Sequence, residues 1–241
     1  MAYRTDPRFA QAGVAVGATD EGLRSFMLSV YNYMGLGLAI TGLVALAVAS
    51  SPAIYMPIFT TPLKWVVILA PLGFVMFLSA RIHAMSVSAA QLTFWLFAGV
   101  MGISMASIFL VFTGESIARV FLVTAATFGA VSLYGYTTKR DLSGMGSFLF
   151  MGLIGIVIAS LVNLFIGSTA LQFAVSVIGV LVFTGLTAWD TQRLKEQYLG
   201  SLQYAGADIA GKTAVMGALS LYLNFINLFT MLLQLMGNQR N

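Results

Sequence analysis

Residues 213–236 read TAVMGALSLYLNFINLFTMLLQLM, and these twenty-four residues contain no charged side chain. A helix rising about 1.5 Å per residue crosses roughly 30 Å of hydrocarbon in about this length. Small and polar residues recur in it at alternating spacings of four and three, which places them on one helix face. The members of this polar stripe are Thr213, Gly217, Ser220, Asn224, Asn227, Met231 and Gln234.

A polar stripe on an otherwise bulky apolar helix is expected to turn away from lipid, toward protein or trapped water. The stretch therefore predicts a central helix ringed by others. An equally open interpretation is that the stripe hydrogen-bonds one neighbouring helix and does nothing more.

Six further apolar runs are long enough to span a bilayer. They are Met27–Ser50, Lys64–Ala80, Ala90–Phe112, Arg119–Thr137, Ser147–Ile166 and Ala170–Trp189. The chain is 59% apolar and 8% charged, far from the composition of a soluble domain. The runs lack the polar and apolar alternation of barrel strands. We predict an all-α integral membrane protein in which residues 23–241 form one seven-helix domain after a cytoplasmic tail at residues 1–22.

The segments between the runs are short and rich in turn residues. The longest, Asp190 to Lys212, carries several charges and is predicted to be a solvated loop. Nine lysines and arginines lie in the N-terminal tail and the loops on its side, against three on the opposite side. The positive-inside rule then places the N-terminus in the cytoplasm, and an odd number of spans places the C-terminus across the membrane.

The composition also excludes several functions. The chain has no cysteine and one histidine, which leaves no thiolate site and no paired-histidine zinc motif. No second membrane aspartate is present to form a catalytic pair, so we expect no enzymatic activity and no cofactor. The basic residues lie singly between apolar runs, which argues against binding of nucleic acid.

Ionisable groups near the spans are the informative ones, because a charge at the bilayer centre costs about 2.5–3.5 kcal/mol even on the lenient insertion scale. Asp190 follows the sixth run and Arg81 follows the second, at the same side of the membrane. One interpretation makes Asp190 an anchor in headgroup water. The other turns it inward as the inner gate of an ion pathway, with Arg81 as its counter-charge.

Three further motifs stand out: YGYTTKRDLS at residues 134–143, GLTAWDTQ at residues 185–192 and GALSLYLNFINLF at residues 217–229. Together they resemble bacterial members of the transmembrane Bax-inhibitor-motif family. The resemblance covers nearly the whole chain. It implies a bacterial inner-membrane protein with seven spans, of which the seventh is central.

The resemblance also implies a calcium leak controlled by pH through two aspartates. Asp190 matches the first aspartate, whereas Asn224 stands where the family usually has the second, and an amide cannot titrate. Arg81 resembles the arginine that pairs with the first aspartate in the closed pore. We therefore expect a pathway for calcium or other cations gated by an Arg81–Asp190 contact, with Ser220 and Asn227 on the supporting pore face.

In this hypothesis Asp190 is a weak calcium ligand and Asn224 a neutral coordinating oxygen, because hard cations prefer several oxygens and added negative charge. The alternative is a non-transporting regulator that binds a membrane protease or a partner in stress or death signalling. Its contact surface would be Lys139, Arg140 and Asp141, or the segment after Asp190.

Overall fold

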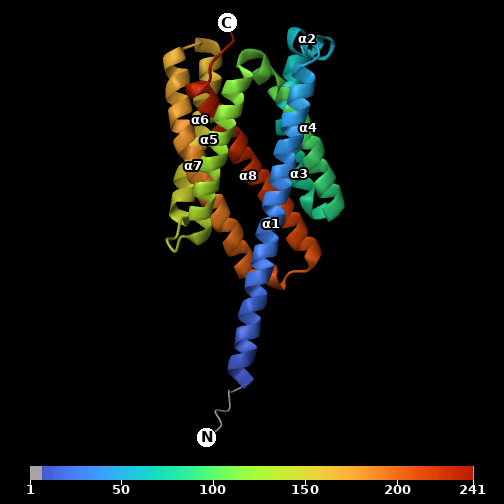
Figure 1. Cartoon of the computed structure of the whole chain (residues 1–241), viewed down its shortest axis with the longest axis vertical. Helices are drawn as coiled ribbons and strands as arrows, with labels where there is room; N and C mark the ends of the chain where they lie inside the picture. Colours follow the sequence, from blue (N-terminus) through green and yellow to red (C-terminus); the bar gives the residue numbers. More distant parts are fainter. Residues whose placement is uncertain (1–6, 241) are drawn as a thin grey trace.

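The computed structural model describes the backbone of residues 7–240 and the side chains of residues 20–240. Over this range the chain forms eight α-helices and two short 3₁₀ turns (Figure 1). The helices are α1 (Pro7–Ala49), α2 (Pro52–Thr60), α3 (Leu63–Arg81), α4 (Val87–Val111), α5 (Gly114–Thr137), α6 (Ser143–Ile166), α7 (Thr169–Gly200) and α8 (Ala207–Met236). The 3₁₀ turns are η1 (Ile82–Ala84) and η2 (Leu202–Tyr204).

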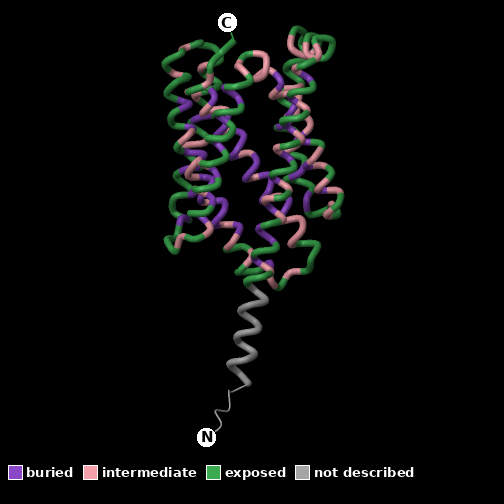
Figure 2. The backbone as a smooth tube through the Cα atoms, in the orientation of Figure 1, coloured by how far each residue is buried: buried purple, intermediate pink, exposed green. Residues whose placement is uncertain are grey.

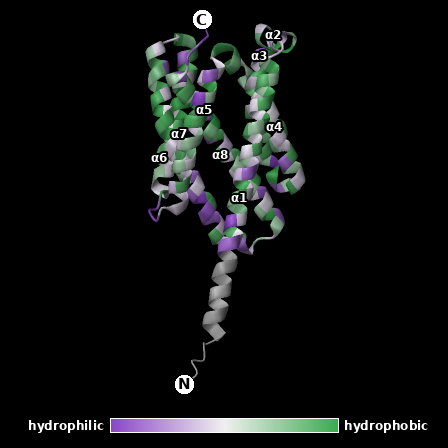
Figure 3. Ribbon diagram, in the orientation of Figure 1, coloured by the Kyte–Doolittle hydropathy of each residue, from purple (hydrophilic) through white to green (hydrophobic). Residues whose placement is uncertain are grey.

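Within the described chain, seven helices are long and apolar enough to cross a membrane, which confirms the predicted all-α membrane fold. Figure 3 shows apolar residues along these helices and hydrophilic ones gathered toward their ends. The nine-residue α2, with Pro57 inside it, is too short to span and was not predicted. The bundle of seven spans has two ends. We call the end that carries residues 82–86, 138–142 and 201–206 proximal, and the opposite end distal.

α8 lies at the centre of the bundle, as predicted. It runs obliquely between α5 and α7 on one side and α1 and α4 on the other, and it packs against all four (Figure 1). It is also the most buried of the seven spans (Figure 2). α3 packs on the outer side of α4, and α6 packs on α7.

Aromatic side chains fix α8 between its neighbours. The ring of Tyr222 meets Phe94 and Phe97 of α4 edge-on at 5.9 and 5.4 Å, and its hydroxyl lies 2.6 Å from Thr41 Oγ1 of α1. Phe225 meets Phe128 of α5 in the same way at 5.5 Å. Edge-to-face pairs of this kind contribute about 0.5–1.5 kcal/mol beyond the area they bury.

Capping residues set several helix boundaries. Ser86, Thr113 and Ser168 precede α4, α5 and α7, and each side chain accepts a hydrogen bond from a backbone N–H of the first turn. α6 ends at Gly167, whose φ of +67° is left-handed and favours glycine.

The predicted solvated loop from Asp190 to Lys212 is wrong. α7 continues ten residues beyond Asp190 to Gly200, and α8 begins at Ala207. The charges do not break the helices, because they pair at helical spacing. Asp190 lies 2.7 Å from Arg193, and Asp208 lies 2.7 Å from Lys212.

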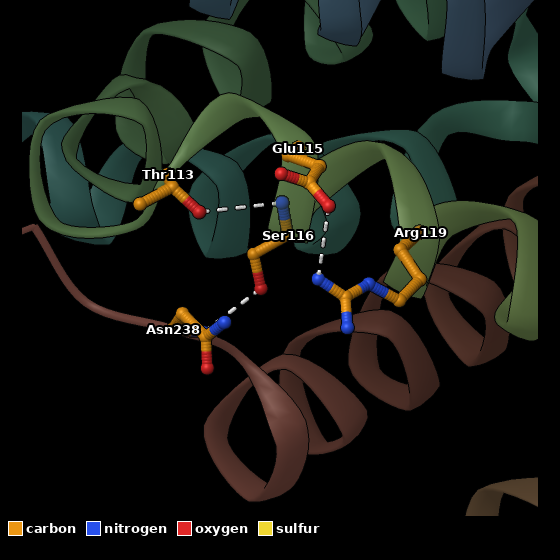
Figure 4. Close-up of polar contacts among 5 residues, drawn as sticks. All are labelled: Thr113, Glu115, Ser116, Arg119 and Asn238. Atoms are coloured by element: carbon orange, nitrogen blue, oxygen red, sulfur yellow. Dashed lines mark hydrogen bonds and ion pairs between the residues drawn. The ribbon is translucent and has the colours of Figure 1, made fainter.

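The segment after α8 folds back on the turn between α4 and α5 (Figure 4). The backbone N–H of Asn238 donates to Ser116 Oγ at 2.8 Å, and Thr113 N donates to the Asn238 carbonyl at 3.0 Å. Beside this contact, Glu115 and Arg119 form an exposed ion pair at 3.4 Å. The distal ends of α4, α5 and α8 are thereby tied together.

Candidate functional site

Asp190 is a buried carboxylate in the interior of the bundle. It is 4% exposed, which excludes the interpretation as an anchor in headgroup water. Its Oδ2 accepts hydrogen bonds from Asn224 Nδ2 at 2.7 Å and from Ser220 Oγ at 3.1 Å, both on α8. A buried charge is tolerated only when it is paired and hydrogen-bonded, and these partners meet that requirement.

The counter-charge of Asp190 is Arg193. Its Nη2 lies 2.7 Å from Asp190 Oδ1, three residues further along the same helix. The guanidinium carbon also lies 4.7 Å from the centroid of the Trp189 ring, in cation–π geometry. The arginine side chain is 40% exposed, so the pair joins a buried acid to a base that is partly open to solvent.

The predicted Arg81–Asp190 contact is not formed. Arg81 is exposed and takes part in none of the ion pairs among residues 20–240. The physical reason is the packing order: α3 lies against α4 and does not pack on α7. Arg193 takes the position that was predicted for Arg81.

Five of the seven members of the polar stripe of α8 contact α7, in antiparallel register. Gly217 lies against Leu194, and Gly179 of α7 lies against Met231. At the distal end Ser176 Oγ donates to the side-chain oxygen of Gln234 at 2.8 Å. Both earlier interpretations therefore hold in part: the stripe turns away from lipid, and one neighbour satisfies most of it.

Not every predicted residue joins the site. Ser220 and Asn224 do, whereas Asn227 donates to the carbonyl of Leu223 on its own helix at 2.8 Å. The stripe pattern could not separate Asn227 from Asn224, because both fall on the same face by spacing.

A cavity of about 460 Å³ leads to this site from the proximal end. Its walls come from the end of α3 with η1, from α7 and from the first half of α8. They include Ser79, His83, Arg193, Lys212 and Ser220. The cavity thus reaches both Ser220 and Arg193, the partners of the buried carboxylate. Its mouth is basic, and Lys212 is paired there with the exposed Asp208.

Sequence reasoning missed Gln192, which holds the loop between α5 and α6. Its Nε2 donates to the carbonyl of Arg140, and its Oε1 accepts from Leu142 N, both at 2.8 Å. Lys195 adds a bond from Nζ to the carbonyl of Tyr136 at 2.8 Å. The first motif is thus tied to the second by Gln192, and the second to the third by Asp190 and Asn224. The three motifs form one connected structure.

The oxygens at Asp190 bear on cation binding. Among the described residues no three histidines, aspartates or glutamates gather in one place, so a high-charge calcium site of the usual kind is not formed there. Asp190 Oδ1 is buried and accepts no hydrogen bond of good geometry, although Arg193 lies close to it. The Arg193 guanidinium thus occupies the position beside Oδ1 that a cation would take.

Comparison with known proteins gives a consistent result. A family model described as "Inhibitor of apoptosis-promoting Bax1" matches residues 23–241. The inner membrane protein YbhL of Escherichia coli strain K12 is 50% identical over 222 residues, which cover 91% of this chain and 94% of YbhL. The protein RP147 of Rickettsia prowazekii is 49% identical over 223 residues, covering 92% and 93% of the two chains. The chain belongs to the Bax inhibitor family of membrane proteins.

Proposed function

We propose that the protein is a pH-sensitive leak pathway for cations, calcium among them, with Asp190 as the cation-binding group. The observation that carries this proposal is the buried carboxylate of Asp190, whose partners Arg193 and Ser220 line a cavity open at the proximal end. Polar and ionisable residues inside a membrane bundle are costly, and they mark ion pathways by default.

Arg193, in place of Arg81, is the gate in this proposal. A cation that reaches Asp190 through the cavity must displace the guanidinium from Oδ1. Arg193 can give up that contact and keep its stacking on Trp189, because the two contacts involve different faces of the group. In this proposal the contact between Arg193 and Asp190 is the closed state of the pathway.

The affinity for calcium is expected to be low. The site offers one carboxylate, the Asn224 side-chain oxygen and the Ser220 hydroxyl, whereas calcium takes six to eight oxygens and gains from each added negative charge. Calcium is therefore cargo in this proposal and not a resident cofactor.

The expected pH response follows from the charges around the carboxylate. The α8 neighbours Ser220 and Asn224 are neutral, and the charged or titratable groups toward the cavity are Arg193, His83 and Lys212. In this proposal, protonation of Asp190 removes the negative charge that attracts a cation. The leak should fall as the pH falls from 8 to 6.

The orientation belongs to the same proposal. The N-terminal segment and the proximal end of the bundle together carry nine of the twelve lysines and arginines. By the positive-inside rule the cavity then opens toward the cytoplasm of a bacterial inner membrane, with the N-terminus inside and the C-terminus outside.

The test is calcium flux into liposomes that contain the purified protein, from pH 6 to 8. Asp190→Asn keeps the shape of the side chain but removes its charge, and it should lower the flux by at least about tenfold, because a desolvated cation loses its counter-charge. Asp208→Asn at the exposed mouth is the matched control and should change the flux by less than about twofold. Unchanged flux in Asp190→Asn would refute the proposal.

A second candidate is the non-transporting regulator. The observation in its favour is the α5–α6 loop, where Gln192 holds the backbone and the side chains of Lys139, Arg140 and Asp141 remain exposed. A rigid charged surface of this kind suits recognition of a membrane-protein partner. Two results together would favour it: no calcium flux into liposomes that contain the protein, and a crosslinked partner that is lost in a Lys139→Glu variant.

A further inference from the structure

A long groove separates α1 from α5. α1 packs on α4 and α8, and α5 packs on α7 and α8, so the two helices approach α8 from different sides. The groove has a volume of about 650 Å³ and is larger than the cavity at Asp190. Phe225 of α8 is part of its wall.

The groove opens toward the bilayer. Leu28 and Leu133 on its rims are 50% and 63% exposed, as expected of side chains that face lipid. Gly35 of α1 and Gly129 of α5 also line it, and a Cβ added at either position would meet no atom within 4 Å. The space beside these glycines is therefore not filled by protein.

The interior of the groove is suited to an apolar ligand. Its walls are mostly apolar, and the hydroxyls of two lining residues, Tyr31 and Ser132, lie 2.6 Å apart within hydrogen-bond distance. Ser132 is bonded in addition to Thr191 Oγ1 at 2.9 Å. An unfilled space of this size forfeits packing contacts along its whole lining. Acyl chains are the material that a bilayer supplies to fill it.

The proximal end of the groove has a positively charged side chain, that of Arg24. Arg24 lines it, is exposed, and forms no ion pair with any residue between 20 and 240. Glu21 lies three residues earlier on α1 but is not paired with it. Basic groups at one membrane face, beside a pocket between spans, are suited to the phosphate of an anionic lipid.

We propose that the groove between α1 and α5 is a binding site for one anionic phospholipid. An acyl chain lies along the space beside Gly35 and Gly129, and the headgroup phosphate meets Arg24. This site is separate from Asp190 and does not depend on a leak.

The test is native mass spectrometry of the protein purified in mild detergent and incubated with equal amounts of phosphatidylglycerol and phosphatidylethanolamine. The expected result for the unaltered chain is one tightly held phosphatidylglycerol. Gly35→Leu and Gly129→Leu place a side chain in the groove from positions where the added Cβ meets no atom within 4 Å, and each should reduce the bound lipid at least about fivefold. Gly73→Leu is the matched control, since Gly73 is exposed on α3 with open space around it, and it should bind as the unaltered chain does.

Arg24→Gln leaves the apolar walls untouched and provides a readout independent of any packing change. It should lower the preference for phosphatidylglycerol about fivefold, the effect expected of one arginine at an anionic membrane surface. Equal binding in the filled and unaltered chains would overturn the proposal. So would equal retention of the two lipids by the unaltered chain, or a second copy of the protein that occupies the groove and is lost on filling.

Discussion

The interface between α7 and α8 has two halves of opposite character. In the proximal half Asp190 is held by Asn224 and Ser220, and a cavity reaches the site. In the distal half Val182, Phe183 and Leu186 of α7 pack with Leu228 of α8 in an apolar cluster. The same two helices thus line a cavity in the proximal half of their interface and form an apolar contact in the distal half.

If the protein conducts cations as proposed, this difference places the barrier in the distal half. In that proposal a cation approaches Asp190 through the proximal cavity, and the apolar cluster beyond it offers no oxygen. Apolar constrictions of this kind gate ion pathways by excluding water. In the proposed pathway Arg193 controls access to the acid, and the distal cluster controls passage beyond it.

The largest expected effect comes from truncating a side chain of the distal apolar cluster. Leu228 is fully buried, and Leu228→Ala should lower the free energy of unfolding by about 2–5 kcal/mol through the cavity that it leaves. Unfolding in detergent measures this change, and the proposed leak should rise at the same time. Leu161→Ala is the control, since Leu161 is 57% exposed, and it should have little effect on either quantity. A stable Leu228→Ala variant would show that the distal half is loosely packed.

The second effect comes from adding a charge to the polar half. Asn224→Asp places another carboxylate against Asp190 Oδ2, where the amide now donates a bond of 2.7 Å. The two acids cannot both ionise cheaply, so they should share a proton at low pH and repel at high pH. We expect a loss of about 1–3 kcal/mol of stability at pH 8 that is recovered near pH 5. The proposed flux should also acquire a steeper pH dependence, and an unchanged pH response would contradict the two-carboxylate argument.

A smaller effect compares one glycine from each half. An added Cβ at Gly217 would lie 2.6 Å from Cδ2 of Leu194, which is itself buried in the core. At Gly179 the nearest atom is Met231 Cγ at 2.9 Å, on a more adaptable side chain. Gly217→Ala should therefore cost about 1 kcal/mol and Gly179→Ala less, as measured by thermal unfolding. The reverse order would mean that the distal half is the more rigid one.

The smallest effect concerns a pH response outside the membrane. The side chain and backbone of Ser143 donate hydrogen bonds to Asp141, and they lower the pKa of that carboxyl below its ordinary value. A lowered pKa adds stability above the unfolded-state pKa, and this stability is lost as the pH falls through the folded-state value. Asp141→Asn should remove a slight acid-dependent shift of the melting temperature below about pH 4. It should leave the flux between pH 6 and 8 unchanged, which separates this loop from the response assigned to Asp190.

The spans were predictable because hydrocarbon imposes length and apolarity directly on the sequence. The continuation of α7 to Gly200 was not, because charged residues resemble a loop when they are counted without their spacing. The spacing of Asp190 to Arg193 and of Asp208 to Lys212 was the available sign of helix.

The site was predictable only in part. Asp190 and Asn224 were found from their position and from the family motifs, and the structure brings them together. The counter-charge was misassigned, because the resemblance pointed to Arg81 while local geometry favoured Arg193. Gln192 ends the second motif, but its role was not predictable, since that role depends on a loop fifty residues earlier in the chain.

The ion pair within α7 also bears on how the protein is made. Arg193 and Asp190 belong to one helix, so the acid acquires its partner as soon as α7 coils. Asn224 and Ser220 arrive only with α8, which follows the other six spans in the chain and is translated after them. During that interval the arginine alone compensates the carboxylate. The pair thus lowers the energetic penalty of delivering an aspartate into lipid before its permanent neighbours exist.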